Sequence, residues 1–235
     1  MRFFLPLTLA LSLLLAGCGT QTPPPPQEAP APAEEPAPIP EPLPEPQPVS
    51  EPAPEPGDLV LVKDYISNIR VDLKYAGENN FTGQTIYDFT EAYLRYGTVQ
   101  KLAAAQEILD AEGYSLLIWD AFRPPEAQFR LWEVCPDPVY VANPEKGFSS
   151  HSRGNTVDVT LTLKDGSPVE TPSGFDDFSP LADRDYSDVP EAAAANARLL
   201  EDVMTDCGFK PYSGEWWHFS DTDSYPVKED FVPGK

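Results

Sequence analysis

The chain has 235 residues, enough for an N-terminal extension and one domain of about 175 residues but too few for two large enzymatic domains. Asp and Glu number 38 against 16 Lys and Arg, which gives a formal net charge of −22. We do not expect a protein this acidic to bind nucleic acid, because binding to the phosphate backbone depends on Lys and Arg. Hydrophobic residues make up 41% of the sequence, so the chain can still bury an ordinary core.

Residues 1–18 have the pattern of a bacterial export signal. Arg2 precedes an apolar stretch at 3–15, which is shorter than the roughly 20 residues that a membrane-spanning helix needs. The stretch ends in LLAGC and resembles the lipobox of bacterial lipoproteins, whose cysteine is lipidated. We therefore expect a lipoprotein signal peptide, an acylated Cys18 inserted in the lipid bilayer, and a working domain outside the cytoplasm. The alternative is a cleaved soluble signal peptide with an incidental cysteine.

Residues 19–57 are predicted to be a disordered tether. They contain seven Glu, no Lys or Arg and few large apolar side chains, and 16 of the 34 positions from 23 to 56 are Pro. Such a segment cannot bury enough surface to offset the entropy of ordering. In the extended polyproline conformation, at ~3.1 Å per residue, it would reach roughly 100 Å. The tether would hold the domain at 58–235 away from the membrane; a ligand for a proline-binding module is the alternative.

Two short apolar runs, at 58–62 and 69–75, begin the domain and are typical of strands. A helix is then predicted over 99–112, where apolar residues recur at helical spacing. Thr98 is a suitable N-cap for this helix, and Gly113 is a suitable C′ residue.

A buried strand is predicted at 116–119, ending at Asp120. A second helix is expected near 125–134, after a Pro pair, and a third from about 190 to just before Gly208. These helices and strands do not follow a regular βαβ repeat. We therefore expect an α+β fold, with a small and mostly antiparallel central sheet flanked by helices.

Residues 155–163 show the clearest strand pattern in the chain, because apolar and polar residues alternate along them. The pattern predicts one face in the core and one polar face, on which Asp158 would line a cleft together with three threonines. Gly154, just before the strand, permits a turn that would bring His151 beside it.

The segment GEWWHF places Glu215 and His218 three residues apart. In a regular strand these two side chains would point to opposite faces. If both serve one site, Glu215 must lie in the turn near Gly214 or in a β-bulge. The alternative is a Trp-rich hydrophobic strand with a surface Glu and a surface His.

Only two histidines occur in the chain, and each lies near acidic residues beside a Gly turn and a strand. Two imidazoles and one carboxylate, from His151, Asp158 and His218, would make a three-ligand zinc site with a fourth position for water. Zinc lowers the pKa of such a water toward 7. A carboxylate outside the ligand set must then accept the proton, and Glu215 is the candidate by position.

Four stretches resemble one family. SSHSRGNTVDVTL at 149–161 and EWWHF at 215–219 look like the signature of the zinc D-Ala-D-Ala dipeptidases known from vancomycin resistance, which are relatives of the zinc D,D-carboxypeptidases of cell-wall metabolism. VDLKYAGENNFTG and LLIWDAFRPPEAQ agree with the dipeptidase branch. Little of the family pattern is visible at 135–147 and 179–190, so the resemblance does not fix the shape of the substrate pocket.

The resemblance implies the identity of the metal ligands and of the base. It makes His151, Asp158 and His218 the ligands of one Zn²⁺ per chain, within the central sheet, and it makes Glu215 the catalytic base.

Arg123 matches the family arginine that stabilises negative charge developing on the scissile carbonyl oxygen. A permanently charged guanidinium at the end of a strand suits that role. As an alternative, Arg123 could simply pair with Asp120 on the surface.

By the same resemblance, Ser149 or Ser150 and Asp176 fall where the family contacts the two ends of the dipeptide. Asp176 would pair with the free amino group. The neighbouring Asp177 could replace Asp176 after a shift of one residue.

Cys135 and Cys207 remain once Cys18 is assigned to lipid. An oxidising exterior would permit a disulfide between them. Alternatively, Cys207 is a small buried hydrophobic residue on its helix. Without a third histidine to activate it, neither cysteine is expected to be a nucleophile.

The sequence thus predicts a lipid-anchored zinc metallopeptidase that hydrolyses D-Ala-D-Ala outside the cytoplasm and takes part in cell-wall peptide turnover. One alternative is a D,D-carboxypeptidase that acts on peptidoglycan stem peptides. The other is a cell-wall-binding domain without catalytic activity.

Overall fold

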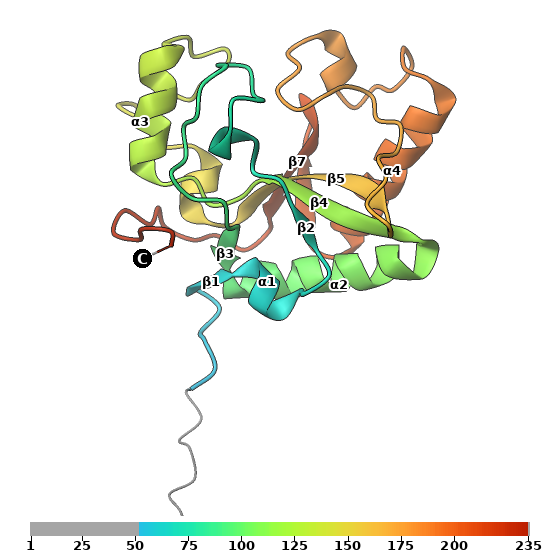
Figure 1. Ribbon diagram of the computed structural model, residues 1–235, viewed down its shortest axis with the longest axis horizontal. Helices are drawn as coiled ribbons and strands as arrows, with labels where there is room; N and C mark the ends of the chain where they lie inside the picture. Colours follow the sequence, from blue (N-terminus) through green and yellow to red (C-terminus); the bar gives the residue numbers. More distant parts are fainter. Residues whose placement is uncertain (1–51, 235) are drawn as a thin grey trace, which may run out of the picture. The chain divides into compact units, whose positions relative to one another are not determined.

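A five-stranded sheet crosses the middle of the computed structural model, which describes residues 52–234 (Figure 1). Its strand order is β2-β4-β5-β7-β6, with bounds Arg70–Val71, Tyr114–Asp120, Thr156–Leu163, Glu215–Asp221 and Phe209–Tyr212. The β2–β4 pair is parallel and the other three pairs are antiparallel. This confirms the predicted α+β fold with a mostly antiparallel sheet.

The helices lie around this sheet. Their bounds are Val62–Tyr65 for α1, Tyr96–Glu112 for α2, Pro125–Val134 for α3 and Glu191–Asp206 for α4. Helix α2 packs on β4 and on α4, and α4 also contacts β5, β6 and β7 (Figure 1). A separate antiparallel pair, β1 (Leu59–Leu61) with β3 (Tyr93–Arg95), leads into α2. No helix among residues 52–234 is both long enough and apolar enough to cross a bilayer.

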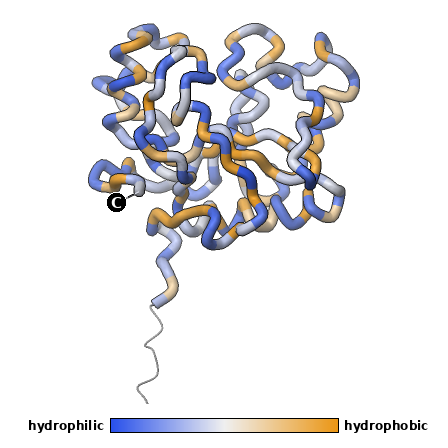
Figure 2. The backbone as a smooth tube through the Cα atoms, viewed as in Figure 1, coloured by the Kyte–Doolittle hydropathy of each residue, from blue (hydrophilic) through white to orange (hydrophobic). Residues whose placement is uncertain are grey.

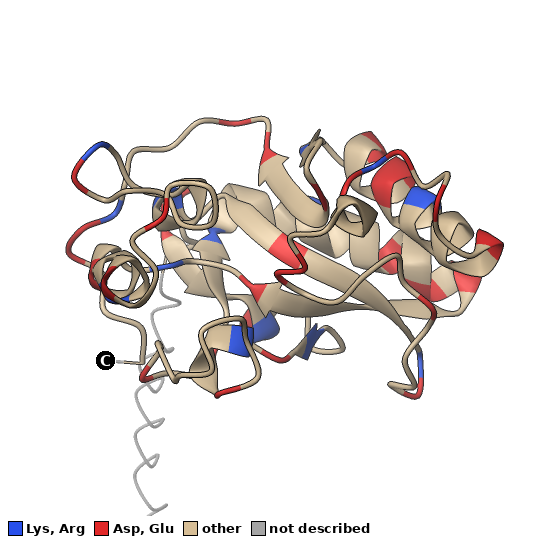
Figure 3. Cartoon of the chain, turned by 90° about the horizontal axis from the view of Figure 1, so that it is seen from above, with Lys and Arg blue, Asp and Glu red and all other residues tan. Residues whose placement is uncertain are grey.

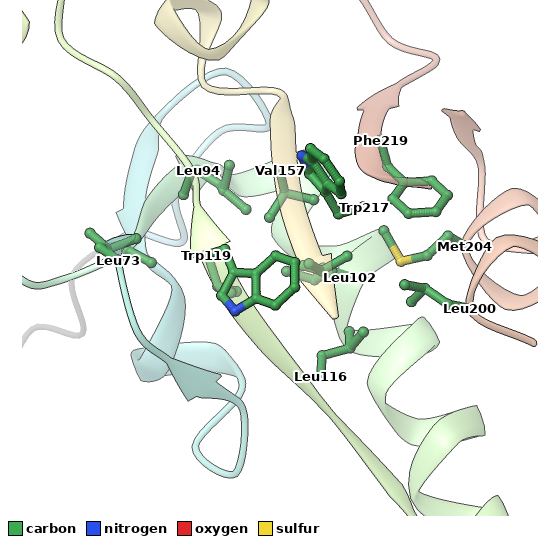
Figure 4. Close-up of a cluster of buried hydrophobic side chains, with 14 of the residues drawn as sticks. Leu73, Leu94, Leu102, Leu116, Trp119, Val157, Leu200, Met204, Trp217 and Phe219 are labelled. Carbon is green, nitrogen blue, oxygen red and sulfur yellow. The ribbon is translucent and has the colours of Figure 1, made fainter. Parts of the chain in front are cut away.

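The core fills the space between α2, α4 and the sheet (Figure 4). Leu102 of α2 and Leu200 of α4 are fully buried there, together with Val157 of β5 and Trp217 and Phe219 of β7. Hydrophobic segments accordingly follow the strands and the helices that cover them (Figure 2). Truncating a fully buried leucine at such a position costs about 2–5 kcal/mol of stability.

Helix α2 ends where the sequence predicts, but it begins differently. Gly113 takes the left-handed conformation, with φ 93°, and closes the helix. The prediction of Thr98 as N-cap is wrong, because the helix begins at Tyr96 and Thr98 lies inside it. The Thr98 hydroxyl instead donates to Asp221 Oδ2 at 2.7 Å, so a contact with β7 takes the place of capping.

Strand β5 departs from the one-sided pattern expected of it. Every residue from Thr156 to Thr162 is buried, the polar ones included. Each face of the strand is therefore covered, and the alternation of Val and Thr does not mark an exposed face. The predicted strand over 69–75 is also shorter, because it ends at Val71 and a 3₁₀ turn over Lys74–Ala76 follows.

The predicted signal peptide, the acylated Cys18 and most of the predicted tether lie outside the described residues. At the domain boundary, the Pro56 carbonyl accepts a hydrogen bond from the Gly97 amide, so the fixed structure begins slightly before residue 58. Cys135 and Cys207 are half-buried free cysteines, not a disulfide.

Candidate metal centre and active site

Three polar residues form a row across the middle of the sheet. Asp120 of β4 is paired with Asp158 of β5, and Asp158 is paired with His218 of β7. Directly opposed residues on neighbouring strands project from the same face of a sheet. Charged residues lie mainly in the helices and loops around the sheet (Figure 3). Asp120 and Asp158 differ from them, because both lie within strands of the sheet. The row brings together two residues that are 60 positions apart in the sequence, Asp158 and His218.

His151 reaches this row from a 3₁₀ turn over Ser150–Arg153. The Ser149 side chain accepts a hydrogen bond from the His151 amide, and Gly154 closes the turn with φ 75°. His151 Nδ1 lies 2.9 Å from the Ala121 carbonyl oxygen and donates to it. That bond fixes the tautomer and leaves the lone pair of Nε2 directed at Asp158 Oδ2, 3.4 Å away.

One ligand atom from each of His151, Asp158 and His218 lies within 4.8 Å of the others. Asp158 Oδ1 is buried without a hydrogen-bond partner, although His218 Nδ1 is only 3.0 Å away. A buried carboxylate oxygen without a partner is costly. Two imidazoles and a carboxylate converging on one point are a ligand set typical of zinc, with a position left over for water. The donor set therefore fits zinc.

The charges of the three groups support one another. Burial alone would raise the pKa of Asp158, but His151 and His218 outweigh it and hold the pKa below its ordinary value. Burial lowers the pKa of His151, yet the carboxylates of Asp158 and Asp120 more than compensate and raise it. The carboxylate is thus ionised and ready to bind a cation at neutral pH.

Glu215 shares the site with His218 because the hairpin between β6 and β7 is irregular. Tyr212 pairs with Glu215, but the next pair is Pro211 with Phe219. Three residues of β7 therefore have no partner in β6. The spacing of Glu215 and His218 predicted either a turn near Gly214 or a bulge, and the structure shows the bulge. Glu215 Oε2 lies 3.4 Å from His218 Nδ1. Burial, followed by the charge of Asp158, raises the pKa of Glu215.

Arg123 follows β4 and is held by a buried network. Its Nη2 lies 2.6 Å from Asp120 Oδ2, and its Nη1 donates to Gln128 Oε1 at 3.1 Å. Tyr87 donates to Asp120 Oδ1 at 2.7 Å. The ion pair with Asp120 exists, but it is not the surface pair considered as an alternative, because Asp120 is fully buried. These contacts fix the orientation of the Arg123 guanidinium.

The pocket over the candidate metal ligands has a volume of about 390 Å³. It brings together every site residue predicted within the domain: Arg123, Ser149, Ser150, His151, Asp158, Asp176, Glu215 and His218. The other lining residues are Tyr75, Pro138, Val139, Tyr140, Ala142, Phe148, Phe178 and Tyr212. The sequence did not single out Tyr75 or Tyr212. Tyr75 belongs to the stretch VDLKYAGENNFTG, whose resemblance to the family could have indicated that Tyr75 lies in the site.

Asp176, not Asp177, faces this pocket. Its Oδ2 accepts a hydrogen bond from Tyr75 at 2.8 Å, whereas Asp177 Oδ1 accepts one from the Ser179 amide. Asp176 takes a left-handed backbone conformation, with φ 54°, which Asp tolerates better than most residues other than Gly. Burial raises the pKa of Asp176 to about 7.

Asp120 contacts more of the site than the surface pair with Arg123 that was considered from the sequence. Its carboxylate also accepts from Tyr87 and from the Ala121 amide, and it lies 3.6 Å from His151 Nδ1. The register shift between β4 and β5 near Asp120 sets its position. Spacing within one strand gives no sign of such a shift.

The chain is similar in sequence to proteins of one family. The family described as D-ala-D-ala dipeptidase matches residues 56–233. A D-alanyl-D-alanine dipeptidase of Escherichia coli (strain K12) is 38% identical over 175 residues, which cover 74% of this chain and 90% of that protein. Proteins of the same name are 37% identical in Streptomyces coelicolor, over 70% of this chain and 91% of that protein, and 33% identical in Enterococcus faecium, over 66% and 87%. The chain belongs to the D-ala-D-ala dipeptidase family.

Proposed function

We propose that the chain is a zinc-dependent dipeptidase that hydrolyses D-Ala-D-Ala. The observation that carries the proposal is the convergence of His151, Asp158 and His218 on one point, in a pocket that also holds Glu215 and Arg123. Membership of the family and the names of the relatives support the same reaction and substrate.

His151, Asp158 and His218 would hold one Zn²⁺ per chain. When bound, zinc supplies Lewis-acid chemistry, which makes a water more acidic and polarises a carbonyl group. The hydrogen bond from His151 to the Ala121 carbonyl and the pairing of Asp158 with His218 keep the donor atoms aimed at that position.

Glu215 would carry the proton through the reaction. It accepts the proton of the water whose oxygen bonds to the carbonyl carbon. When the C–N bond breaks, it passes the proton to the leaving amine. One water and one dipeptide thus give two molecules of D-alanine. Arg123 would donate to the carbonyl oxygen as negative charge develops there, and its bonds to Asp120 and Gln128 keep it in place beforehand.

Asp176 and the serines would hold the ends of the dipeptide. The carboxylate of Asp176 lines the pocket beside Tyr75 and could accept from the free ammonium group. Ser149 and Ser150 line another part of the pocket, next to His151. A free amino group that must meet Asp176 would favour a dipeptide over a longer chain.

The place of action that we propose is outside the cytoplasm, on the bacterial membrane. The support is the sequence of residues 1–18, which ends in the lipobox-like LLAGC, and the Pro-rich segment after it. There the substrates at hand are free dipeptide and wall peptides, so we propose a role in cell-wall peptide turnover. Labelling with a fatty acid analogue should mark the wild-type protein and not the Cys18→Ala variant; equal labelling of both would contradict the anchor.

A direct assay separates the dipeptidase from its alternatives. The purified protein is incubated with D-Ala-D-Ala, with L-Ala-L-Ala and with a pentapeptide that ends in D-Ala-D-Ala, and the release of free alanine is measured. We expect hydrolysis of D-Ala-D-Ala alone. Preferred cleavage of the pentapeptide would instead indicate a D,D-carboxypeptidase. Binding of wall peptide without hydrolysis of any substrate would indicate a binding domain.

A further inference from the structure

On the side that faces β6, the hairpin is interrupted between Glu215 and Phe219, although His218 keeps its pairing with Asp158 of β5. The pairs Tyr212 with Glu215 and Pro211 with Phe219 leave three residues of β7, 216–218, between them. Pro211 has no N–H to donate to the ladder. A segment without regular pairing needs another restraint if its side chains are to hold a fixed geometry.

Arg184, from the loop before α4, joins the two strands at this interruption. Its Nε donates to the Tyr212 carbonyl at 2.8 Å, and its Nη2 donates to the His218 carbonyl at 3.0 Å. The guanidinium carbon also lies 4.6 Å from the centre of the Phe219 ring. One rigid, planar group thus bonds both edges of the bulge, in a geometry that the single ammonium of a lysine could not reproduce.

The Arg184 side chain is itself fixed from the side of α4. Its Nη1 lies 2.9 Å from Glu201 Oε2, and only 10% of the side chain is exposed. Tyr186 donates to the same Glu201 oxygen at 3.1 Å. Tyr186 takes a left-handed backbone conformation, with φ 55°. A non-Gly residue keeps such a conformation only where its surroundings impose it.

Arg184 does not line the catalytic pocket. Its hydrogen bonds toward the site go to the Tyr212 and His218 carbonyls of the hairpin backbone. It lies in the 179–190 segment, where the sequence showed little family pattern. We propose that Arg184 is a positioning residue, which fixes the β6–β7 bulge so that His218 Nδ1 points at the metal position and Glu215 stays beside it. This inference rests on the proposed function, because it deepens the account of the same site.

Removal of Arg184 would leave two strand carbonyls without their donor and Glu201 without its cation. The bulge could then relax, and His218 and Glu215 would move together. Outer groups that orient metal ligands typically contribute about 10–100-fold to metal affinity or activity. Substrate contacts would remain, because Arg123 and Asp176 belong to other segments.

The test compares Arg184→Met with Lys101→Met in the full chain. Lys101 is the matched control, because its ammonium also ties β7 to a helix, but at the far end of the strand, through Asp221. Zinc affinity is measured by competition with a chelator. The geometry of the site is followed by the visible absorption of the Co²⁺-substituted protein. Steady-state kinetics with D-Ala-D-Ala give kcat and KM. For Arg184→Met we expect zinc affinity to fall about 10–100-fold, the Co²⁺ spectrum to shift, and kcat to fall with KM unchanged. For Lys101→Met we expect a lower Tm with an unchanged zinc affinity and spectrum.

Unchanged zinc affinity and an unchanged Co²⁺ spectrum in folded Arg184→Met would overturn the proposal, as would equal losses in both variants. Glu201→Gln gives a second test if Arg184→Met does not fold, since it loosens Arg184 while keeping the carbonyl contacts possible. It should shift the Co²⁺ spectrum in the same direction by a smaller amount, and no shift would count against the proposal. Failure of the wild-type protein to hydrolyse D-Ala-D-Ala would contradict the proposed function instead, and the zinc measurements would still decide the role of Arg184.

Discussion

Asp158 and His218 stand opposite each other in the ladder between β5 and β7, with Asp158 Oδ1 3.0 Å from His218 Nδ1. Strand pairing therefore sets the distance between two of the three candidate metal ligands. His151 is the third, and its turn is held by the Ser149 cap and by Gly154. A site built on regular pairing is more rigid than one built on loops alone.

Asp158→Asn should bind zinc much more weakly, because the substitution replaces an anionic ligand with a neutral one between two imidazoles. We expect a loss larger than the roughly 10–100-fold typical of groups outside the ligand set. Thr160→Val, two residues along the same strand, is the control. The Thr160 hydroxyl is buried without a hydrogen-bond partner, so this variant should keep its zinc. Chelator competition measures both, and equal affinities would contradict the assignment of Asp158.

Glu215→Gln should lower kcat by about 10²–10⁴-fold, the usual contribution of a general acid–base group. The amide keeps the shape of the side chain but cannot accept the proton. Zinc content should stay the same, because Glu215 is outside the ligand set. Steady-state kinetics with zinc analysis check the prediction, and an active variant with full zinc content would exclude Glu215 as the base.

Arg123→Lys should lower kcat by about 10²–10³-fold, as the loss of one donor to a developing oxyanion does. Lysine keeps the charge beside Asp120 but cannot also reach Gln128 with a planar group. Arg130→Lys is the control, since Arg130 forms an exposed ion pair with Glu126, and such pairs contribute little. Comparable kcat values in the two variants would count against the role of Arg123.

Asp176 should make stability depend on pH in a specific direction. Its pKa is about 7 in the folded chain against an ordinary value of 3.8, so between these values the folded state holds a proton that the unfolded state has lost. The free energy of unfolding should therefore fall as the pH rises from about 4 to about 7. Asp176→Asn should remove this part of the slope, and Asp177→Asn should not. Denaturant unfolding of chelator-treated protein measures the slope, and identical profiles for all three proteins would refute the expectation.

Much of this fold follows from local patterns. The alternation over 155–163 predicted β5, and Gly113 predicted the end of α2, because each depends on neighbouring residues alone. The odd separation of Glu215 and His218 predicted either a turn near Gly214 or a bulge, since a regular strand cannot place both side chains on one face. These predictions needed no knowledge of distant contacts.

Other features depend on contacts between distant segments and could not be predicted in this way. Thr98 is a residue type that favours the N-cap position, yet its hydroxyl donates to Asp221, which lies far along the chain. Asp120 enters the site through a register shift between β4 and β5. Arg184 bonds two strand carbonyls from a loop with little recognisable pattern. In each case the contact partner depends on tertiary packing, which the spacing of neighbouring residues does not reveal.

The proposed hydrolysis depends above all on one cation held by His151, Asp158 and His218. Its most direct test is to strip the protein with a chelator, add Zn²⁺ back in steps, and measure the release of D-alanine from D-Ala-D-Ala at each step. We predict no release from the stripped protein, followed by a linear rise that stops at one zinc per chain. Full activity in the stripped protein, or no activity at any zinc level, would contradict the account.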